Sequence, residues 1–175
     1  MWRKALAQRD AHSALSFEEG VTPFSFRNIS HRRGEEAAGQ LLEFERVIMT
    51  QQGDEASYLR RLYLSANGAN LRGEDVLEGL QQEVLSGVLW RFHIHPEVRA
   101  SLARDKKSVI LLLPNKEGWR FKSNCPDLVL DKSVYCGAGG APTASEQIVI
   151  RAASYALSET NVFSAKWAFQ RLDAV

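Results

Sequence analysis

The chain has 175 residues, of which 45% are hydrophobic and 25% are charged. This is the composition of an ordinary globular protein that is large enough to bury its own core. Its 22 basic and 21 acidic residues leave a net charge of +1, which predicts no binding to nucleic acid or to a membrane surface, because both leave an excess of basic residues.

The two cysteines, Cys125 and Cys136, are too few to define a disulfide scaffold. The first ten residues (MWRKALAQRD) lack the apolar stretch of a secretory signal, so we expect free thiols. No apolar run reaches the roughly 20 residues that span a bilayer. The sequence as written predicts a cytoplasmic protein, and a periplasmic location follows if a longer parent protein is exported.

Apolar and polar residues alternate along most of the chain, which is the period of β-strands. Strands are predicted at residues 13–17, 40–50, 58–65, 70–77, 87–95, 108–113, 118–124, 129–130, 133–135, 147–150 and 165–172. Asn67-Gly68 predicts a tight hairpin between two of them. About ten short strands with regularly spaced turn signals predict an all-β fold, an antiparallel β-sandwich that is jelly-roll-like.

Three segments are less clear from their pattern. Pro96 to Asp105 (PEVRASLARD) combines a proline with helically spaced apolar residues, which predicts one short helical turn. Ser145 to Ser158 has a helical composition, but the β-branched residues in Gln147 to Ile150 favour a strand there. Gly20 to Gly39 carries the weakest pattern, and His31 to Glu36 (HRRGEE) is interpreted as a solvated loop.

Several stretches resemble the distal part of heparinase II/III-like polysaccharide lyases. They are WRKALAQRDAHSALSF (2–17), RRLYLSANGANLRGEDVLEG (60–79), RFHIHPEVRASLARD (91–105), LPNKEGWRFKSN (113–124), SVYCGAGGAPTASEQIVI (133–150) and KWAFQRL (166–172). These matches are in order and cover almost all of the chain. The resemblance therefore implies that residues 1–175 form a single C-terminal-like β-sandwich domain.

A complete member of that family has an α/α toroid followed by β-sandwich domains, and it cleaves uronic-acid polysaccharides by β-elimination. The resemblance places the tyrosine and histidine residues that act as acid and base mainly in the toroid and in a histidine-rich strand at the start of the sandwich, before the part that this chain resembles. Elimination needs an acid and a base within reach of one sugar. We therefore predict no catalytic residue in this chain and no activity when it is alone. The alternatives are a free-standing carbohydrate-binding module and a chain that assembles with a separately encoded toroid.

The resemblance also implies site residues and partners. His12 lies in an alanine-histidine motif that matches a structural zinc ligand of the family, so zinc is the one cofactor considered, in an incomplete site whose other ligands would lie upstream. Arg91, His93 and His95 are the candidate substrate contacts, since His93 and His95 are two apart on a strand. An acidic polysaccharide is the expected ligand. A toroid partner or a homodimer is expected to cover exposed sheet edges.

Other conspicuous side chains have structural interpretations. The large aromatics are expected to fill the space between the sheets rather than to stack on sugars (Trp90, Trp119, Trp167, Tyr63 and Tyr135). Four arginines match outward-facing strand positions (Arg60, Arg61, Arg91 and Arg120). Asp75, with Glu74 and Arg72, is interpreted as a network that stabilises a turn.

Overall fold

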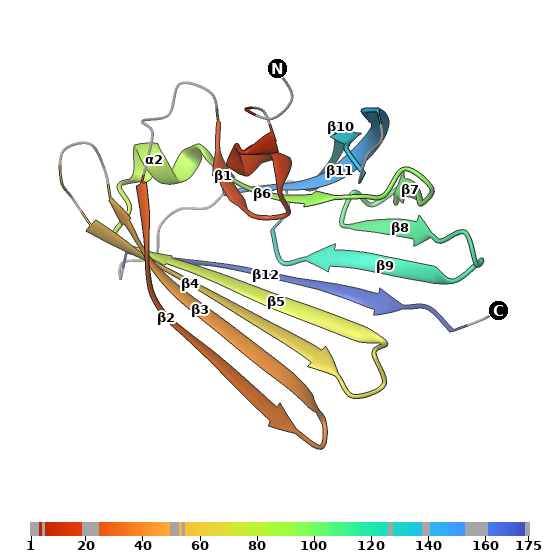
Figure 1. Cartoon of the computed structure of the whole chain (residues 1–175), viewed down its shortest axis with the longest axis horizontal. Helices are drawn as coiled ribbons and strands as arrows, with labels where there is room; N and C mark the ends of the chain where they lie inside the picture. Colours follow the sequence, from red (N-terminus) through yellow and green to blue (C-terminus); the bar gives the residue numbers. More distant parts are fainter. Residues whose placement is uncertain are drawn as a thin grey trace.

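The computed structural model describes residues 4, 6–18, 25–49, 53, 55–125, 128–137, 141–152 and 161–173. These residues form an all-β sandwich of two antiparallel sheets, as the alternating pattern predicts (Figure 1). The smaller sheet has the strand order β1 (Leu15–Phe17), β6 (Val88–His93), β11 (Thr143–Arg151) and β10 (Leu128–Tyr135). No described helix is long and apolar enough to cross a membrane.

The larger sheet has eight strands among the described residues. Its order is β2 (Ser25–Glu36), β3 (Gly39–Met49), β4 (Glu55–Ser65), β5 (Asn70–Glu78), β12 (Val162–Arg171), β9 (Gly118–Ser123), β8 (Ser108–Leu112) and β7 (Arg99–Leu102). Asn67 and Gly68 form the β4–β5 hairpin turn as predicted, and Gly68 adopts a φ of 65°. The described strands are more numerous than predicted, and β4, β5, β11 and β12 are longer than predicted, with 9 to 11 residues.

The core lies between the two sheets, where aromatic side chains from both sheets meet among a larger number of aliphatic ones. Phe92 of β6 contacts Phe121, Trp167 and Phe169 at ring-centroid distances of 5.0, 4.8 and 5.8 Å. Trp90 stacks on Phe163 at 5.5 Å. Such pairs across the two layers hold the sheets together. Trp90 and Trp167 are buried as predicted, whereas the predicted core residue Tyr135 is 37% exposed.

Two of the segment predictions are wrong. His31 to Glu36 is the end of strand β2, not a loop. Pro96 to Asp105 contains strand β7 (Arg99–Leu102) in place of a helical turn. The described helical residues are Lys4, Leu6, those of η1 (Arg9–Ala11) and those of α2 (Gln82–Ser86). Gln147 to Ile150 does lie in a strand, β11, while residues 153–160 of the ambiguous segment lie outside the described residues.

The physical reason for the error in β2 is its position at the sheet edge. Nearly every side chain of this strand is exposed, so the sequence shows no apolar stripe. Backbone pairing to β3 holds the strand instead, from Ser25↔Met49 to Glu36↔Gly39. A register shift between Asn28 and Ser30 and several charged side chains mark it as an edge protected against pairing with other chains.

The two sheets are unequal, and this leaves part of the large sheet uncovered. The hairpin ends of β2 to β5 extend away from the smaller sheet (Figure 1). We call the inner surface of these extended ends the overhang. It is lined by Leu42, Leu62, Leu64 and Leu71 together with Arg33, Gln40 and Leu41, around a hollow of about 370 Å³. Leu64 is 41% exposed there.

Candidate functional site

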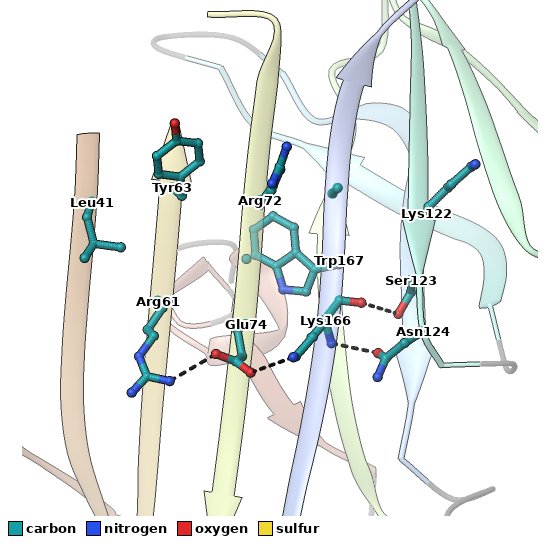
Figure 2. A pocket seen from close by; sticks show the side chains of 12 residues that line it. Leu41, Arg61, Tyr63, Arg72, Glu74, Lys122, Ser123, Asn124, Lys166 and Trp167 are labelled. Carbon is teal, nitrogen blue, oxygen red and sulfur yellow. Dashed lines mark hydrogen bonds and ion pairs between the residues drawn. The ribbon is translucent and has the colours of Figure 1, made fainter. Parts of the chain in front are cut away.

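A hollow of about 500 Å³ lies on the outer face of the large sheet, and we call it the outer groove (Figure 2). It is lined by Leu41, Arg61, Tyr63, Arg72, Gly73, Glu74, Lys122, Ser123, Asn124, Lys166, Trp167 and Ala168. One row of cross-strand neighbours runs along its floor, from Leu41 through Tyr63, Arg72 and Ala168 to Lys122. The small side chain of Ala168 leaves room between its two larger neighbours in that row.

The next row along the outer face is a ladder of alternating charges across five strands. Arg32 binds Glu43 at 2.7 Å, and Arg61 binds Glu43 at 2.9 Å and Glu74 at 3.0 Å. Lys166 completes the row with Glu74 at 3.4 Å. The hydrogen bond from Arg61 lowers the pKa of Glu43. Each cation of the ladder is paired with a carboxylate on a neighbouring strand. The ladder therefore stabilises the pairing of the strands rather than the binding of a ligand.

The two cations that flank Ala168 are less engaged. Arg72 donates to Asn70 Oδ1 at 3.2 Å and lies 5.9 Å from the ring of Tyr63. Within the described part of the chain, Lys122 makes no ion pair. One strand, β12, lies between Arg72 on β5 and Lys122 on β9, so the Cα atoms of these two residues are about 10 Å apart. This pair of cations beside a tyrosine is the feature of the outer groove best suited to an acidic sugar.

A second, more enclosed hollow of about 400 Å³ lies on the inner side of the large sheet, where the smaller sheet ends. We call it the arginine cleft. Its lining combines basic and aromatic side chains: Arg9, His12, Ser13, Ala14, Leu15, Phe26, Phe44, Arg46, Tyr58, Arg60 and Leu62. The segment from Arg9 to Leu15 forms one wall, and strands β2, β3 and β4 form the other.

Three guanidinium groups meet in the arginine cleft. Arg9 lies over the ring of Phe26, with its Cζ atom 3.7 Å from the ring centroid. Burial, followed by the charge of Arg46, lowers the pKa of Arg9. Arg60 is fixed at the floor, where its Nη1 donates to the carbonyl of Ser13 at 3.3 Å. Arg46, on strand β3, also lines this hollow.

A buried carboxylate neutralises one of these three arginines. Asp75 is fully buried, and it accepts hydrogen bonds from Arg60 Nε at 2.6 Å and Arg60 Nη2 at 3.1 Å. It also accepts from the hydroxyl of Tyr58 at 2.5 Å and from Trp167 Nε1 at 2.7 Å. Burial and the charge of Asp75 raise the pKa of Tyr58 well above its usual value, so this hydroxyl remains a donor. The side chain of Arg60 is thereby held at the floor of the cleft by a partner in the core.

This network corrects two interpretations made from the sequence. Arg60 faces inward, opposite to its neighbour Arg61, because successive strand residues point to opposite faces. Asp75 and Glu74 are separated in the same way, so they do not form a common turn network with Arg72. Asp75 holds Arg60 in the core, whereas Glu74 belongs to the charge ladder outside.

The predicted substrate contacts Arg91 and His93 share the outer face of the smaller sheet. Arg91 Nε donates to Ser16 Oγ at 3.0 Å, and Nη1 donates to Gln147 Oε1 at 3.4 Å. His93 Nδ1 lies 2.7 Å from Ser133 Oγ, and Nε2 lies 2.8 Å from the carbonyl of Asp10. Burial lowers the pKa of His93. Both ring nitrogens are therefore engaged within the protein.

His95 lies beyond the end of the strand that carries Arg91 and His93, and His12 lies in the N-terminal segment. Strand β6 ends at His93, and the His95 ring packs against Tyr135, with ring centroids 4.7 Å apart. Nδ1 of His95 accepts the backbone N–H of Glu97 at 3.3 Å. His12 lines the arginine cleft. The structure thus brings Arg91 and His93 together. It places His12 in the segment that contacts His93 through Asp10 and Ser13, while His95 lies beyond the end of the strand.

The predicted zinc ligand His12 can be compared with what zinc requires. A zinc ion in a protein takes three or four ligands from histidine, cysteine and carboxylate side chains. The described residues contain no group of three such side chains placed to hold a metal. The described residues around His12 therefore do not fit a zinc site by themselves, and zinc binding stays a prediction that requires further ligands.

Sequence reasoning missed the arginine cleft. Arg9 and Arg46 were not singled out, since each is an ordinary basic residue within its own segment. The pairing of β3 with β4, which sets Arg46 next to Tyr58, is visible only after folding. One signal was present, because arginine occurs in an inward-facing register at Arg46 and Arg60, where an apolar residue is normal.

Three comparisons relate this chain to known proteins. The profile of the family described as heparinase II/III-like, C-terminal, matches residues 1–166. The FtsZ-localized protein C of Caulobacter vibrioides is 37% identical over 105 residues, which is 54% of this chain and 18% of that protein. The structure of a heparan sulfate lyase HepC mutant from Pedobacter heparinus superposes with a TM-score of 0.71 at 10% identity, over 99% of this chain and 26% of that one. The chain thus spans about a fifth to a quarter of these relatives.

Proposed function

Because the chain belongs to the heparinase II/III-like C-terminal family, we propose that it is the C-terminal sandwich of a lyase of uronic-acid polysaccharides and is inactive alone. The single observation that supports this most strongly is the overhang. Its leucine side chains line an open hollow, although the same side of the sheet is covered by the smaller sheet elsewhere. An apolar surface of this kind is typical of a contact with another protein part, here the toroid.

The chemistry of the described side chains supports inactivity. β-Elimination needs a base to remove a proton next to the uronate carboxyl and an acid to protonate the leaving oxygen. Tyr58 is buried and donates to Asp75, so it does not reach a sugar as a free acid. His93 uses both ring nitrogens within the protein. An acid and a base from another part of the protein, here the toroid, would be needed for the reaction.

An elimination assay tests this proposal. The chain is incubated with heparan sulfate, heparosan and alginate, and the ultraviolet absorbance of the conjugated unsaturated uronate product is followed. We expect no product from the chain alone. Steady formation of unsaturated product, with loss of activity in a Tyr58→Phe or His93→Gln variant, would overturn the inactivity. The proposed role in a lyase is then tested by adding the toroid part of a family member in trans and seeking restored turnover.

The alternative is a free-standing carbohydrate-binding module, and the outer groove favours it. Arg72, Lys122 and Tyr63 border a hollow over Ala168 that could receive an acidic sugar (Figure 2). A Glu74→Gln variant leaves Arg61 and Lys166 without one carboxylate, which makes the groove more cationic. We expect stronger retention on a heparosan affinity column for this variant if the groove is the binding surface, and unchanged retention if it is not.

A second candidate function is suggested by the Caulobacter relative, whose name describes it as localised with FtsZ. The identity of 37% supports the same association for this chain. Co-sedimentation with FtsZ filaments tests it directly. Recovery of the chain in the pellet only when FtsZ is polymerised supports this candidate, and recovery in the supernatant under all conditions rejects it.

A further inference from the structure

We propose that Ser133 and His93 are the nucleophile and the general base of a site that cleaves carboxylic esters on the outer face of the smaller sheet. Ser133 lies on β10 and His93 lies on β6, the two strands on either side of β11. The Oγ atom of Ser133 lies 2.7 Å from Nδ1 of His93. Ester cleavage is a different reaction from β-elimination, so this inference goes beyond the proposed function and does not depend on it.

The second ring nitrogen of His93 determines where the proton of the ring lies. Nε2 lies 2.8 Å from the backbone carbonyl of Asp10, and a carbonyl oxygen can only accept a hydrogen bond. The neutral ring therefore carries its proton on Nε2, and the lone pair of Nδ1 accepts the hydroxyl of Ser133. A hydroxyl that is hydrogen-bonded to a base, with that base oriented by a third group, is the arrangement of an activated nucleophile.

The N-terminal segment fixes His93, while Ser133 stays within reach of a substrate. The backbone N–H of His93 donates to Ser13 Oγ at 3.0 Å, so residues 10–13 hold both the main chain and the ring of His93. Both Ser133 and the His93 side chain are only half-buried. Strand β10 is an edge of the smaller sheet among the described residues. The site is therefore open at this edge, which suits a short acyl group.

Arg91 provides a positive charge on the same face. It is two residues before His93 on β6, so the two side chains point to the same side of the sheet. Arg91 Nε donates to Ser16 Oγ at 3.0 Å and lies 3.8 Å from Asp10 Oδ1, and Nη1 donates to Gln147 Oε1 at 3.4 Å. Within the described residues, Nη2 makes no hydrogen bond. It is thus a donor left for the negative charge that develops on an ester oxygen during attack.

The reaction balances with water as the co-reactant. Ser133 Oγ forms a bond to the carbonyl carbon of the ester, and the hydroxyl proton passes to His93 Nδ1. The bond from that carbon to the alcohol oxygen then breaks, and the departing oxygen takes the proton from Nδ1. Water, which gives a proton to the same nitrogen, attacks the acyl group on Ser133. The acid is released, and the proton returns to Ser133 Oγ.

Covalent labelling with a fluorophosphonate, a reagent for activated serines, tests the nucleophile. The labelled residue is identified by mass spectrometry of the digested protein. We expect labelling of the wild type at Ser133, no label on that peptide in Ser133→Ala, and labelling about a hundredfold slower in His93→Gln, because the general base is lost.

Hydrolysis of 4-nitrophenyl acetate measures turnover. We expect both Ser133→Ala and His93→Gln to lose it. Ser133→Ala keeps His93 in place, so loss in this variant shows that the imidazole does not cleave the ester directly. Arg91→Gln should slow turnover by about tenfold or more, because a donor to the oxyanion is removed.

Ser145→Ala and His31→Gln are the matched controls. Ser145 is the direct strand partner of Ser133 on β11 and is also half-buried, whereas His31 lies on β2, at an edge of the larger sheet. Both variants should label and turn over as the wild type does, and thermal unfolding confirms that every variant is folded. The inference is overturned if Ser133 of the wild type is not labelled, if His93→Gln is labelled at the wild-type rate, or if Ser133→Ala retains turnover. The elimination assay follows a different product, so its outcome does not affect these results.

Discussion

Gly73 on β5 pairs directly with Trp167 on β12, and the indole of Trp167 occupies the space that a side chain at Gly73 would need. A Cβ atom added at Gly73 would lie 2.1 Å from the Cε2 and Cζ2 atoms of that ring. The close approach allows Trp167 Nε1 to reach Asp75, the next inward residue on β5. A glycine in this strand therefore positions one donor of the buried network beneath the arginine cleft.

Gly73→Ala is predicted to destabilise the fold by about 1–3 kcal/mol or more, because the indole is packed and must move. Gly34→Ala is the matched control, since a Cβ there would meet only Leu41 Cβ at 3.8 Å. Urea unfolding of both variants measures the difference. Equal midpoints for the two variants would show that the sheet accommodates the added methyl group without cost.

Asp75→Asn is predicted to cost about 3–5 kcal/mol, because it leaves the Arg60 guanidinium buried without its counter-charge. The adjacent Glu74→Gln variant is the control and should cost less than about 1 kcal/mol, since Glu74 is part of a surface network. Adding Arg60→Met to the Asp75→Asn variant should restore part of the lost stability. Chemical denaturation measures all three, and no recovery in the double variant would reject the unpaired charge as the cause.

The stability of the protein is predicted to fall below neutral pH in a way that depends on His93. Its pKa is lowered in the folded state, mainly by burial, relative to about 6.5 in the unfolded chain. The unfolded state then binds more protons as the pH falls, so the contribution of His93 is present above about pH 6.5 and is lost as the pH falls through the folded-state pKa. Urea unfolding between neutral and mildly acidic pH should show a shallower decline for His93→Gln. An NMR midpoint of the His93 ring at or above 6.5 would contradict the direction.

The overhang is predicted to drive self-association of the isolated chain, as homodimer formation would cover its leucines. Leu64→Glu should shift the protein towards the monomer in size-exclusion chromatography with light scattering. Leu112→Glu is the matched control, because Leu112 is 42% exposed and lies on β8, away from the overhang. A wild type that is monomeric at high concentration, or an equal effect of both variants, would speak against the overhang as the contact surface.

The sequence by itself determined the fold class, most strand positions, the β4–β5 hairpin and the family resemblance. These depend on local features: alternation with a period of two, a two-residue turn signal, and short motifs in order. The strand β2 escaped this reasoning because an edge strand exposed on both sides has no apolar face to show. Strand β7 escaped it because three of its four residues are exposed, so it shows no alternating apolar face.

Only the tertiary structure decided which charged residues meet. Arg9 and Arg46 lie in segments remote in sequence, and they converge because the N-terminal segment crosses the inner face of β3 and β4. Arg60 and Arg61 are neighbours in the chain, yet one joins a buried network and the other a surface ladder. The nearly equal numbers of acidic and basic residues predict neither arrangement. Electrostatic interactions depend on the distance between the charges and on their burial, and both are set by the pairing of strands that are remote in sequence.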